Sequence, residues 1–538
     1  MKKFRIAIAT AYFVIVTLLF LDFTGTLHPW FGWAVDIQFI PAVMAASAAA
    51  LIVLALLTLL FGRIYCSVIC PLGVMQDAVS GISGRRRGRK NRFRYAPAKS
   101  WLRYGIMALF TASILTGTGT LVSLLDPYAA YGRIASNLFA PVFRLGNNLL
   151  NWFAEIANSY AFYPTEVALK SVLALSVAFA TFGLIVVLAW RGGRTYCNTF
   201  CPVGAFLGLV SRFSLFRPTF APDKCTGCGL CEKGCKSSCI DSKNMRVDLS
   251  RCVSCFNCLN QCKFGAMTYA PRWKRLTGEG YAKADTGKPA SESGSVETVR
   301  LAASCPAKRV ELSRRGMLPL LAFAAVAATG RTVLAATARN TRTQAGNSTG
   351  APLLHVDGGL ADIADKEAPQ RQTPLVPPGA ASLGNLNLRC TACHLCISAC
   401  PNAVLHPSTR LSSLMQPEMS FEGGWCRPEC TECSRVCPAG AICKISTAEK
   451  TAISIGHAVW VKENCLSYKG EVQCNSCERH CPTKAITLVA REQSENKSPK
   501  IPVVDNERCI GCGACEYHCP VRPFSAMYVE GNVRHHSV

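Results

Sequence analysis

The stretch Cys225-Thr226-Gly227-Cys228-Gly229-Leu230-Cys231-Glu232-Lys233-Gly234-Cys235 carries four cysteines in the pattern C-x-x-C-x-x-C-x-x-x-C. The same pattern occurs again a short distance downstream, at Cys252, Cys255, Cys258 and Cys262. Thiolates at this spacing are typical ligands of [4Fe–4S] clusters. C-x-x-C pairs also bind zinc, but a zinc ribbon needs only four cysteines, not two complete runs. We therefore predict two clusters in residues 216–272.

This segment is expected to be a small α+β domain of the ferredoxin type. In two-cluster ferredoxins the fourth cysteine of each run ligates the other cluster. We therefore assign one cluster to Cys225, Cys228, Cys231 and Cys262, and the other to Cys252, Cys255, Cys258 and Cys235. Two details depart from the usual pattern. Lys236 and Lys263 stand where proline is common, and Cys239 is an alternative ligand to Cys235.

Four more runs, each ending in Cys-Pro, lie in residues 385–538. They are Cys390, Cys393, Cys396 and Cys400; Cys426, Cys430, Cys433 and Cys437; Cys465, Cys474, Cys477 and Cys481; and Cys509, Cys512, Cys515 and Cys519. These sixteen cysteines predict four further clusters, and therefore six in the whole chain. A secreted disulfide framework would not repeat one spacing in this way, although the chain has 31 cysteines. Cys305 and Cys443 belong to no run.

One of these runs also contains a pattern associated with haem. Cys390-Thr391-Ala392-Cys393-His394 matches the C-x-x-C-H attachment site of c-type haem. Cys396 and Cys400 complete a cluster run around the same residues, and haem attachment would leave these two thiols without a role. We therefore interpret the segment as a cluster site.

Residues 1–215 contain four long apolar segments, which predict an all-α membrane domain. The segments are residues 6–21, 39–61, 102–125 and 167–190. In lipid each must be helical, because only a helix satisfies its own backbone groups. A signal peptide would explain the first segment, but no small-residue cleavage site follows it and three further segments do. We expect a four-helix bundle embedded in a bilayer.

The distribution of charge predicts the orientation of this domain. The connection between the second and third segments has one acid, Asp77, and the basic residues Arg63, Arg85, Arg86, Arg87, Arg89, Lys90, Arg92, Arg94 and Lys99. The loop at residues 126–166 has two arginines and three acids. By the positive-inside rule the first connection is cytoplasmic and the second periplasmic. We attribute the net charge of +25 to this orientation and expect no nucleic-acid partner.

A sequence repeat follows the second and fourth apolar segments. Gly62-Arg63-Ile64-Tyr65-Cys66-Ser67-Val68-Ile69-Cys70-Pro71-Leu72-Gly73 returns as Gly193-Arg194-Thr195-Tyr196-Cys197-Asn198-Thr199-Phe200-Cys201-Pro202-Val203-Gly204. Both C-x-x-x-C-P pairs are expected at the cytoplasmic face. Thiolates are soft-metal ligands, so Cys66, Cys70, Cys197 and Cys201 together suit a metal ion or a further cluster. Two redox-active dithiols are the alternative.

Between the two cysteine-rich regions lies Ser313-Arg314-Arg315-Gly316-Met317-Leu318, followed by an apolar run to Gly330. Twin arginines before an apolar segment resemble a Tat export signal, which carries folded, cofactor-loaded domains across a bacterial membrane. A buried Ala/Leu helix after a chance Arg-Arg pair is the alternative. We expect residues 313–337 to be this signal or a fifth membrane span, with flexible linkers at 273–312 and 338–384.

The order of these parts resembles two known families. Residues 1–270, with four spans, two C-x-x-x-C-P motifs and a two-cluster ferredoxin, look like NapH-type membrane quinol dehydrogenase components. Residues 313–538, with twin arginines and four cluster runs, resemble the exported NapG/MauM ferredoxin subunits. The chain is interpreted as a fusion of the two, in the bacterial inner membrane, with ferredoxin domains on its cytoplasmic and periplasmic sides.

The resemblance implies oxidation of membrane quinol and delivery of electrons to a periplasmic reductase or cytochrome c. By analogy with four-cluster electron-transfer subunits, the first C-terminal run should exchange its last cysteine with the fourth run, and the second with the third. His28 and Asp126 are the rim residues considered as proton acceptors. The alternative is a copper reductase or a maturation factor for a metalloenzyme, which predicts Met/His tracts that the chain lacks. A regulatory redox sensor would not need six clusters.

Overall fold

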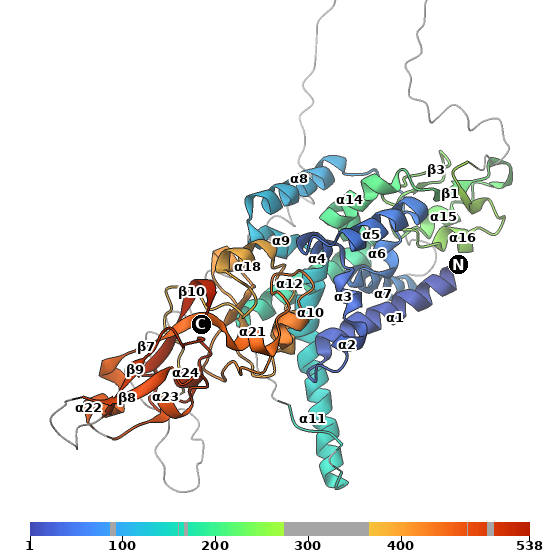
Figure 1. Ribbon diagram of the computed structural model, residues 1–538. Coiled ribbons are helices and arrows are strands. Elements are labelled where there is room, and N and C mark those ends of the chain that lie inside the picture. Colours follow the sequence, from blue (N-terminus) through green and yellow to red (C-terminus); the bar gives the residue numbers. More distant parts are fainter. Residues whose placement is uncertain (87–92, 160, 166–169, 274–364, 471, 492–499) are drawn as a thin grey trace, which may run out of the picture. The chain divides into compact units, whose positions relative to one another are not determined.

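The computed structural model describes residues 1–86, 93–159, 161–165, 170–273, 365–470, 472–491 and 500–538. These residues belong to one compact unit formed by residues 1–279 and 364–538 (Figure 1). The predicted twin-arginine segment at 313–337 and Cys305 lie outside the described residues. So do nearly all of the predicted linker at 273–312 and the first part of the linker at 338–384.

Residues 1–211 are mainly helical. Their helices are α1 (Lys2–Leu21), α2 (His28–Phe31), α3 (Trp33–Asp36), α4 (Phe39–Met44), α5 (Ala48–Phe61), α6 (Tyr65–Val68), α7 (Pro71–Arg86), α8 (Ser100–Thr116), α9 (Gly119–Leu125), α10 (Pro127–Ile134), the π-helix η2 (Ala135–Phe139), α11 (Ala140–Ile156), α12 (Val172–Gly192), α13 (Thr195–Thr199) and α14 (Pro202–Ser211). Among the described residues, α1 and α12 are long and apolar enough to cross a membrane. Signal sequences and buried core helices share this property, so two such helices are only a weak indication.

The second and third apolar segments are not single helices, and the expectation of four uninterrupted spans is wrong at both. The second is divided into α4 and α5, with Ala46 at a φ of 52° between them. The third is divided into α8 and α9 by Gly117, which adopts the left-handed conformation that ends many helices. Hydropathy alone does not reveal such an interruption of a helix, because the residues on both sides of it are apolar.

The two copies of the sequence repeat fold alike. In each, a short helix (α6 or α13) ends before a Cys-Pro pair, and the next helix (α7 or α14) begins at the proline. Proline suits the first helical position because its missing N–H would have no partner there. Two residues after each proline, Gly73 and Gly204 let the helix pack closely against the backbone of the preceding short helix. A Cβ at these positions would lie 2.3 Å from the Cys66 carbonyl oxygen and 2.2 Å from the Cys197 carbonyl oxygen.

The first ferredoxin part is built from short elements around its cysteines. They are β1 (Phe216–Phe220), η3 (Pro222–Lys224), α15 (Leu230–Lys233), β2 (Ile240–Asp241), β3 (Arg246–Val247), α16 (Asn257–Gln261) and β4 (Met267–Pro271). β1 pairs with β4 and β2 with β3, both antiparallel. Its small core consists largely of cysteine side chains with Phe220, Ile240 and Met267.

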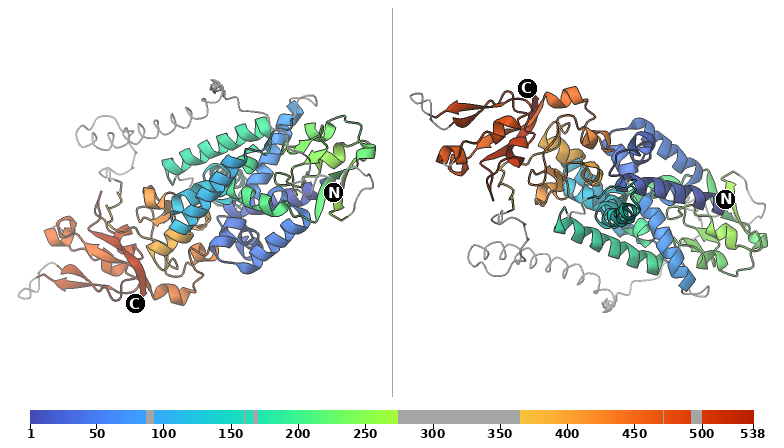
Figure 2. Two further views of the ribbon diagram at one scale, coloured as in Figure 1. Left: turned by 90° about the horizontal axis from the view of Figure 1, so that it is seen from above. Right: turned by 90° about the horizontal axis from the view of Figure 1, so that it is seen from below.

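The C-terminal part is larger and is also built from short helices and strands (Figure 2). Its elements are α18 (Leu383–Arg389), α19 (Leu395–Ala399), β5 (Leu405–Pro407), η4 (Leu411–Ser413), β6 (Pro417–Met419), α20 (Glu432–Arg435), α21 (Thr447–Thr451), β7 (Ile453–Trp460), η5 (Lys462–Asn464), α22 (Leu466–Lys469), α23 (Ser476–Arg479), β8 (Ile486–Ala490), β9 (Lys500–Val504), α24 (Ala514–Tyr517) and β10 (Met527–Ser537). The strand pairs β5–β6, β7–β10 and β8–β9 are antiparallel, and the β7–β10 register shifts between Gly531 and His536.

Candidate iron–sulfur sites

Two cavities in the first ferredoxin part are lined by the predicted ligands. Site I, of about 360 Å³, is lined by Cys225, Cys228, Cys231 and Cys262. Site II, of about 410 Å³, is lined by Cys235, Cys252, Cys255 and Cys258. Each cavity takes three cysteines from one run and the fourth from the other, which is the grouping that the exchange predicts. Cys239 also lines site II, with its Sγ 3.4 Å from the Sγ of Cys235, so it still competes for the fourth position.

Two further cavities lie among the C-terminal runs. Site IV, of about 350 Å³, is lined by Cys400, Cys426, Cys430 and Cys433. Site VI, of about 370 Å³, is lined by Cys465, Cys474, Cys477 and Cys519.

The remaining C-terminal thiols form two more groups. Burial, and then neighbouring thiols that include Cys437, raise the pKa of Cys396 well above its ordinary value. This proximity defines site III as Cys390, Cys393, Cys396 and Cys437. Burial, and then the neighbours Cys509 and Cys481, raise the pKa of Cys512 to about 12. Site V is therefore Cys481, Cys509, Cys512 and Cys515.

The expected exchange between the first and fourth runs, and between the second and third, is wrong for this structure. The first run exchanges its last cysteine with the second, and the third run with the fourth. The reason is local packing, since α19 contacts α20 and α23 contacts α24. Runs adjacent in sequence therefore share sites, as they do in the first ferredoxin part.

The four C-terminal sites follow one another in space. Sites III and IV share the first two runs, and sites V and VI share the last two. The two pairs meet where the Cys426 N–H of site IV donates to the Cys512 carbonyl oxygen of site V at 2.9 Å. The order III, IV, V, VI is thus a continuous series.

The donor sets fit four-iron clusters better than single metal ions. Among the described residues, no three Cys, His, Asp or Glu side chains already converge as they would around one ion. A four-iron cluster has a different requirement, because its four thiolates bond to four separate irons and surround a cube. The cavities at sites I, IV and VI, each lined by four thiols, and the cavity at site II, lined by five, meet that requirement.

Cys66, Cys70, Cys197 and Cys201 also come together, and we call them the four-thiol group. All four side chains are buried. Burial, and then Cys197 and Cys66, raise the pKa of Cys70. Burial, and then all three other thiols, raise the pKa of Cys201. The sequence repeat therefore brings one C-x-x-x-C-P pair against the other.

Two buried arginines, one from each repeat, lie against this group. Arg63 Nη2 is 3.7 Å from Cys66 Sγ and donates to the Cys197 carbonyl oxygen at 3.2 Å. Arg194 Nη1 is 3.8 Å from Cys197 Sγ and donates to the Cys66 carbonyl oxygen at 2.7 Å. Each arginine therefore binds the backbone of the other repeat.

The charge of Arg63 bears on which group would fit among the four thiols. Arg63 is fully buried, its Nε has no hydrogen-bond partner, and in the described parts of the chain no carboxylate forms an ion pair with it. A buried cation is costly unless a negative charge lies close by. Metal-bound or cluster-bound thiolates would supply that charge, whereas neutral thiols or a pair of disulfides would not. The surroundings thus fit a metal centre.

Arg194, by contrast, has its own carboxylate. Asp77 accepts a hydrogen bond from Arg194 Nε at 2.8 Å and also lies 3.4 Å from both Lys236 Nζ and Arg5 Nη1. Burial would raise the pKa of Asp77, but the cations, Arg194 and Lys236 first, hold it well below its ordinary value. Asp77 therefore joins α1, α7, the four-thiol group and the edge of site II.

The four-thiol group has connections toward site II. Arg63 Nη1 donates to the Ser250 carbonyl oxygen at 3.1 Å, two residues before Cys252. The Arg194 N–H donates to the Lys236 carbonyl oxygen at 2.9 Å, next to Cys235. Both arginines thus link the group to the chain that forms site II.

A second set of connections leads toward site III. Burial, and then Cys201, Cys197 and Asp126, raise the pKa of Tyr196, while Arg133 lowers it. Arg133 Nη1 in turn donates to the Ala392 carbonyl oxygen at 3.3 Å, between the ligands Cys390 and Cys393. The four-thiol group therefore lies between site II and site III.

The histidine of the haem-like pattern has a structural role. His394 is buried and lies 3.1 Å from the Met415 carbonyl oxygen through Nε2 and 3.3 Å from Asn137 Nδ2 through Nδ1. A carbonyl oxygen can only accept, so Nε2 carries the proton. Burial lowers the pKa of His394 to about 3. His394 therefore holds the site III loop against η2 as a neutral ring.

The two candidate proton acceptors do not share a site. His28 is buried, with Nδ1 3.9 Å from Asp22 Oδ2. Asp126 is the N-cap of α10, where its Oδ1 accepts from the Tyr128 N–H. Burial raises the pKa of Asp126 to about 7.

Sequence reasoning missed the two arginines and Asp77. A signal for the arginines was present, because Gly-Arg opens both copies of the repeat.

Comparisons with known proteins agree with this picture. Residues 43–90 and 175–220, which contain the two C-x-x-x-C-P motifs, match a 4Fe-4S binding domain family, and residues 472–522 match a 4Fe-4S dicluster domain family. The ferredoxin-type protein NapG of Escherichia coli is 32% identical over 173 residues, which are 30% of this chain and 74% of NapG. The methylamine utilization ferredoxin-type protein MauM of Methylophilus methylotrophus is 37% identical over 156 residues, 28% of this chain and 67% of MauM.

Two further relatives are matched over less of their length. The putative electron transport protein YccM of Escherichia coli is 25% identical over 228 residues, 41% of this chain and 55% of YccM. The chain spans 38% of the length of an uncharacterized Methanocaldococcus jannaschii protein, MJ0749. No solved structure matches the chain.

The cysteine sites and these matches define an iron–sulfur, ferredoxin-type electron-transport protein that holds multiple [4Fe–4S] clusters. More closely, the chain belongs to the family of ferredoxin-type proteins that includes NapG and MauM.

Proposed function

We propose that this protein oxidises quinol in a bacterial inner membrane and passes the electrons through its clusters to a periplasmic reductase or cytochrome. The apolar helices α1 and α12 and the charge distribution around the apolar segments support a membrane location. The kinship with NapG and MauM supports electron transfer by [4Fe–4S] clusters.

The observation that carries the proposal is that the two ferredoxin parts contact opposite ends of the apolar segments. The first ferredoxin part contacts the ends that the charge distribution predicts to be cytoplasmic. Ser254 Oγ donates to the Phe61 carbonyl oxygen at 2.8 Å, at the end of the second segment. Arg103, at the start of the third segment, donates to the Ser250 carbonyl oxygen at 2.8 Å.

The C-terminal part contacts the ends predicted to be periplasmic. Thr120 Oγ1, near the end of the third segment, donates to the Leu411 carbonyl oxygen at 2.8 Å. Lys170, at the start of the fourth, donates to the Ile397 carbonyl oxygen. Two independent properties, the loop charges and the contact pattern, therefore favour the same transmembrane arrangement.

The four-thiol group would complete this arrangement as a seventh metal centre. It lies between site II and site III, so it can connect clusters that would otherwise be separated by the helical domain. A cluster with four thiolate ligands is net negative, and the buried Arg63, which forms no ion pair with a carboxylate among the described residues, would balance part of that charge. When bound, these centres supply one-electron redox chemistry, and the chain contributes their ligands, charge balance and order.

Quinol oxidation is tested with the full chain in lipid nanodiscs under anaerobic conditions. Mixing with a menaquinol analogue should bleach the cluster absorbance, and adding a periplasmic cytochrome should restore it. If quinol causes no bleaching while a reduced soluble ferredoxin bleaches the clusters rapidly, the quinol assignment is wrong and the cytoplasmic clusters receive the electrons.

The seventh centre is tested by iron content. Six four-iron clusters hold about 24 iron atoms per chain and seven hold about 28. Replacing Cys66, Cys70, Cys197 and Cys201 with serine should lower the count by about four atoms and leave the other clusters intact. An unchanged iron count would contradict a metal centre at the four-thiol group and would favour the alternative of two redox-active dithiols.

A further inference from the structure

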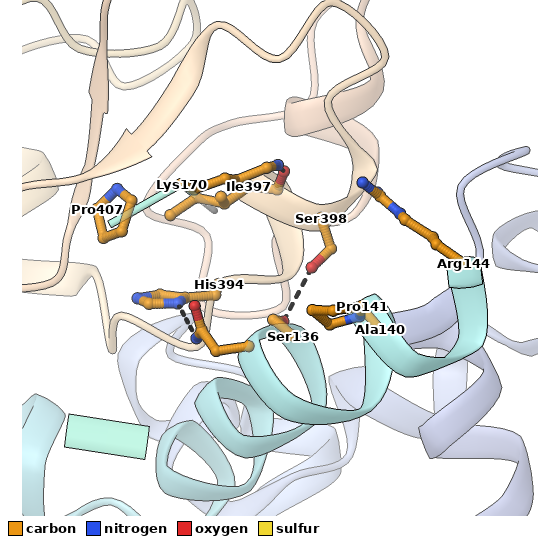
Figure 3. A pocket seen from close by; sticks show the side chains of 10 residues that line it. Ser136, Ala140, Pro141, Arg144, Lys170, His394, Ile397, Ser398 and Pro407 are labelled. Atoms are coloured by element: carbon orange, nitrogen blue, oxygen red, sulfur yellow. Dashed lines mark hydrogen bonds between the residues drawn. The ribbon is translucent and has the colours of Figure 1, made fainter. Parts of the chain in front are cut away.

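A pocket lies where the helical domain meets the loop of site III. One wall is formed by η2 and the first turns of α11, with Ser136, Asn137 and Ala140, and the other by the chain from His394 to Ser398 (Figure 3). About 530 Å³ of space lies among these residues, a figure that includes the part open to solvent. A ligand here would therefore lie partly in the pocket and partly outside it.

The pocket lies directly against the ligands of site III. His394 is between Cys393 and Cys396, and Ile397 follows Cys396 directly. The loop is fixed to the helical wall by a hydrogen bond of 2.9 Å between Ser398 and Ser136 and by the contact between His394 and Asn137 (Figure 3). A molecule in the pocket would therefore be separated from a site III cluster by little more than the loop that holds that cluster.

The lining combines apolar surface with two basic side chains. Ala140, Pro141, Ile397 and Pro407 supply the apolar part, and Lys170 and Arg144 the positive charge. No carboxylate is among the described residues that line it. Such a lining suits a flat, largely apolar ring whose oxygens accept hydrogen bonds or become negative.

The helix that begins at the pocket offers a route from lipid. α11, in cyan in Figure 1, exposes a large apolar surface. Its exposed apolar side chains are Val142, Phe143, Leu145, Leu149, Leu150, Trp152, Phe153 and Ile156. Amphipathic helices of this kind lie in the membrane interface with their apolar face among the acyl chains. The first turns of α11 therefore place the pocket at the depth where a lipid-soluble molecule presents its headgroup.

We propose that this pocket binds the quinol headgroup, and that site III is the first cluster to receive its electrons. The inference rests on the proposed function and adds where in the structure the quinol binds. Quinol would lose two electrons and two protons to become quinone, and clusters held by the cysteines of the series would supply two one-electron acceptors for those electrons. The two O–H bonds break, and the protons leave through the open side of the pocket. Lys170 and Arg144 stabilise the quinol oxygen as its proton departs.

The test fills the pocket without altering any cluster ligand. Ala140→Trp places a large side chain in the lining, and Ala154→Trp puts the same change on the same helix away from the pocket. In nanodiscs, quinol-driven bleaching should be about tenfold slower or more in the first variant and nearly unchanged in the second. Lys170→Met should also slow it, mainly by raising the quinol concentration needed for half-maximal rate.

Two controls separate the possible failures. Iron content and dithionite reduction should be normal in every variant, which shows that the clusters are loaded. If quinol reduces the wild-type protein and Ala140→Trp at equal rates, the pocket assignment is wrong while the proposed function stands. If quinol does not reduce the wild-type protein at all, the proposed function itself fails.

Discussion

Asp77 is the carboxylate that pairs with three basic side chains, two in the helical domain and one in the first ferredoxin part. Asp77→Asn removes the negative partner of Arg194, Lys236 and Arg5. Breaking one side of a buried ion pair typically costs about 3–5 kcal/mol, because a charge is left uncompensated. We expect thermal unfolding of the variant in nanodiscs to begin at clearly lower temperature. The exposed Asp223→Asn should change stability by less than about 0.5 kcal/mol. An equal effect of both variants would contradict the role of Asp77.

The same ion pairs predict a dependence on pH. The pKa of Asp77 is held below its ordinary value of about 3.9, so below that value the unfolded chain binds more protons at this group than the folded chain does. The stabilisation is fully present above the ordinary pKa and is lost as the pH falls through the folded pKa. Acidification should therefore narrow the stability difference between wild type and Asp77→Asn, as measured by unfolding temperature across a pH series.

Arg63 is expected to influence the potential of the four-thiol centre. Arg63→Gln removes a positive charge whose Nη2 lies 3.7 Å from Cys66 Sγ. Reduction adds negative charge there, so the variant should be harder to reduce by about 60 mV or more, a tenfold change for a one-electron couple. Potentiometric titration followed by EPR measures this, using the signal absent from the serine variant of the four-thiol group. Arg212→Gln, which changes an exposed arginine, is the control; a shift of similar size there would contradict the local effect.

At the scale of elements, the first turn of the helix that begins at each Cys-Pro pair has no room for a larger residue at its glycine. Gly73→Ala would place a Cβ 2.3 Å from the Cys66 carbonyl oxygen and 2.6 Å from Arg194 Nη1, whereas Gly81→Ala on the same helix meets nothing within 4 Å. Overpacking typically costs about 1–3 kcal/mol, and here it would also displace a thiol. We expect Gly73→Ala to lose iron from the four-thiol centre and Gly81→Ala to retain it, measured as iron per chain.

The sequence predicted those parts of the site that depend on spacing. The exchange within the first ferredoxin part agrees with the grouping of Cys235 and Cys262, because local spacing determines it. The C-terminal pairing was predicted by analogy and failed, since it depends on which short helices pack together. The breaks at Ala46 and Gly117 were missed because apolar composition does not reveal a positive φ. Arg63 and Lys170 contact residues that are far away in the sequence, and no single sequence motif predicts such contacts.

For the whole molecule, the central expectation is that the two ferredoxin parts lie on opposite sides of a membrane. A protease site inserted after Lys243, in the turn between β2 and β3, should be protected in spheroplasts and cut in inverted vesicles. A site inserted after Lys469, at the end of α22, should show the reverse. Both insertions lie next to exposed residues and leave every cysteine ligand unchanged. Cleavage of both sites from the same side would overturn the transmembrane series of clusters.

The crossed arginines have a consequence for how the protein is made. Arg63 binds the backbone at Cys197, and Arg194 binds the backbone at Cys66, so each half of the centre is held by a residue from the other. During synthesis the first cysteine pair must wait, without its partner arginine, until the ribosome has passed the second repeat. A centre built from both repeats can therefore be completed only after Arg194 has been made, and a chain truncated before Arg194 would lack both the second cysteine pair and the arginine that binds the Cys66 backbone.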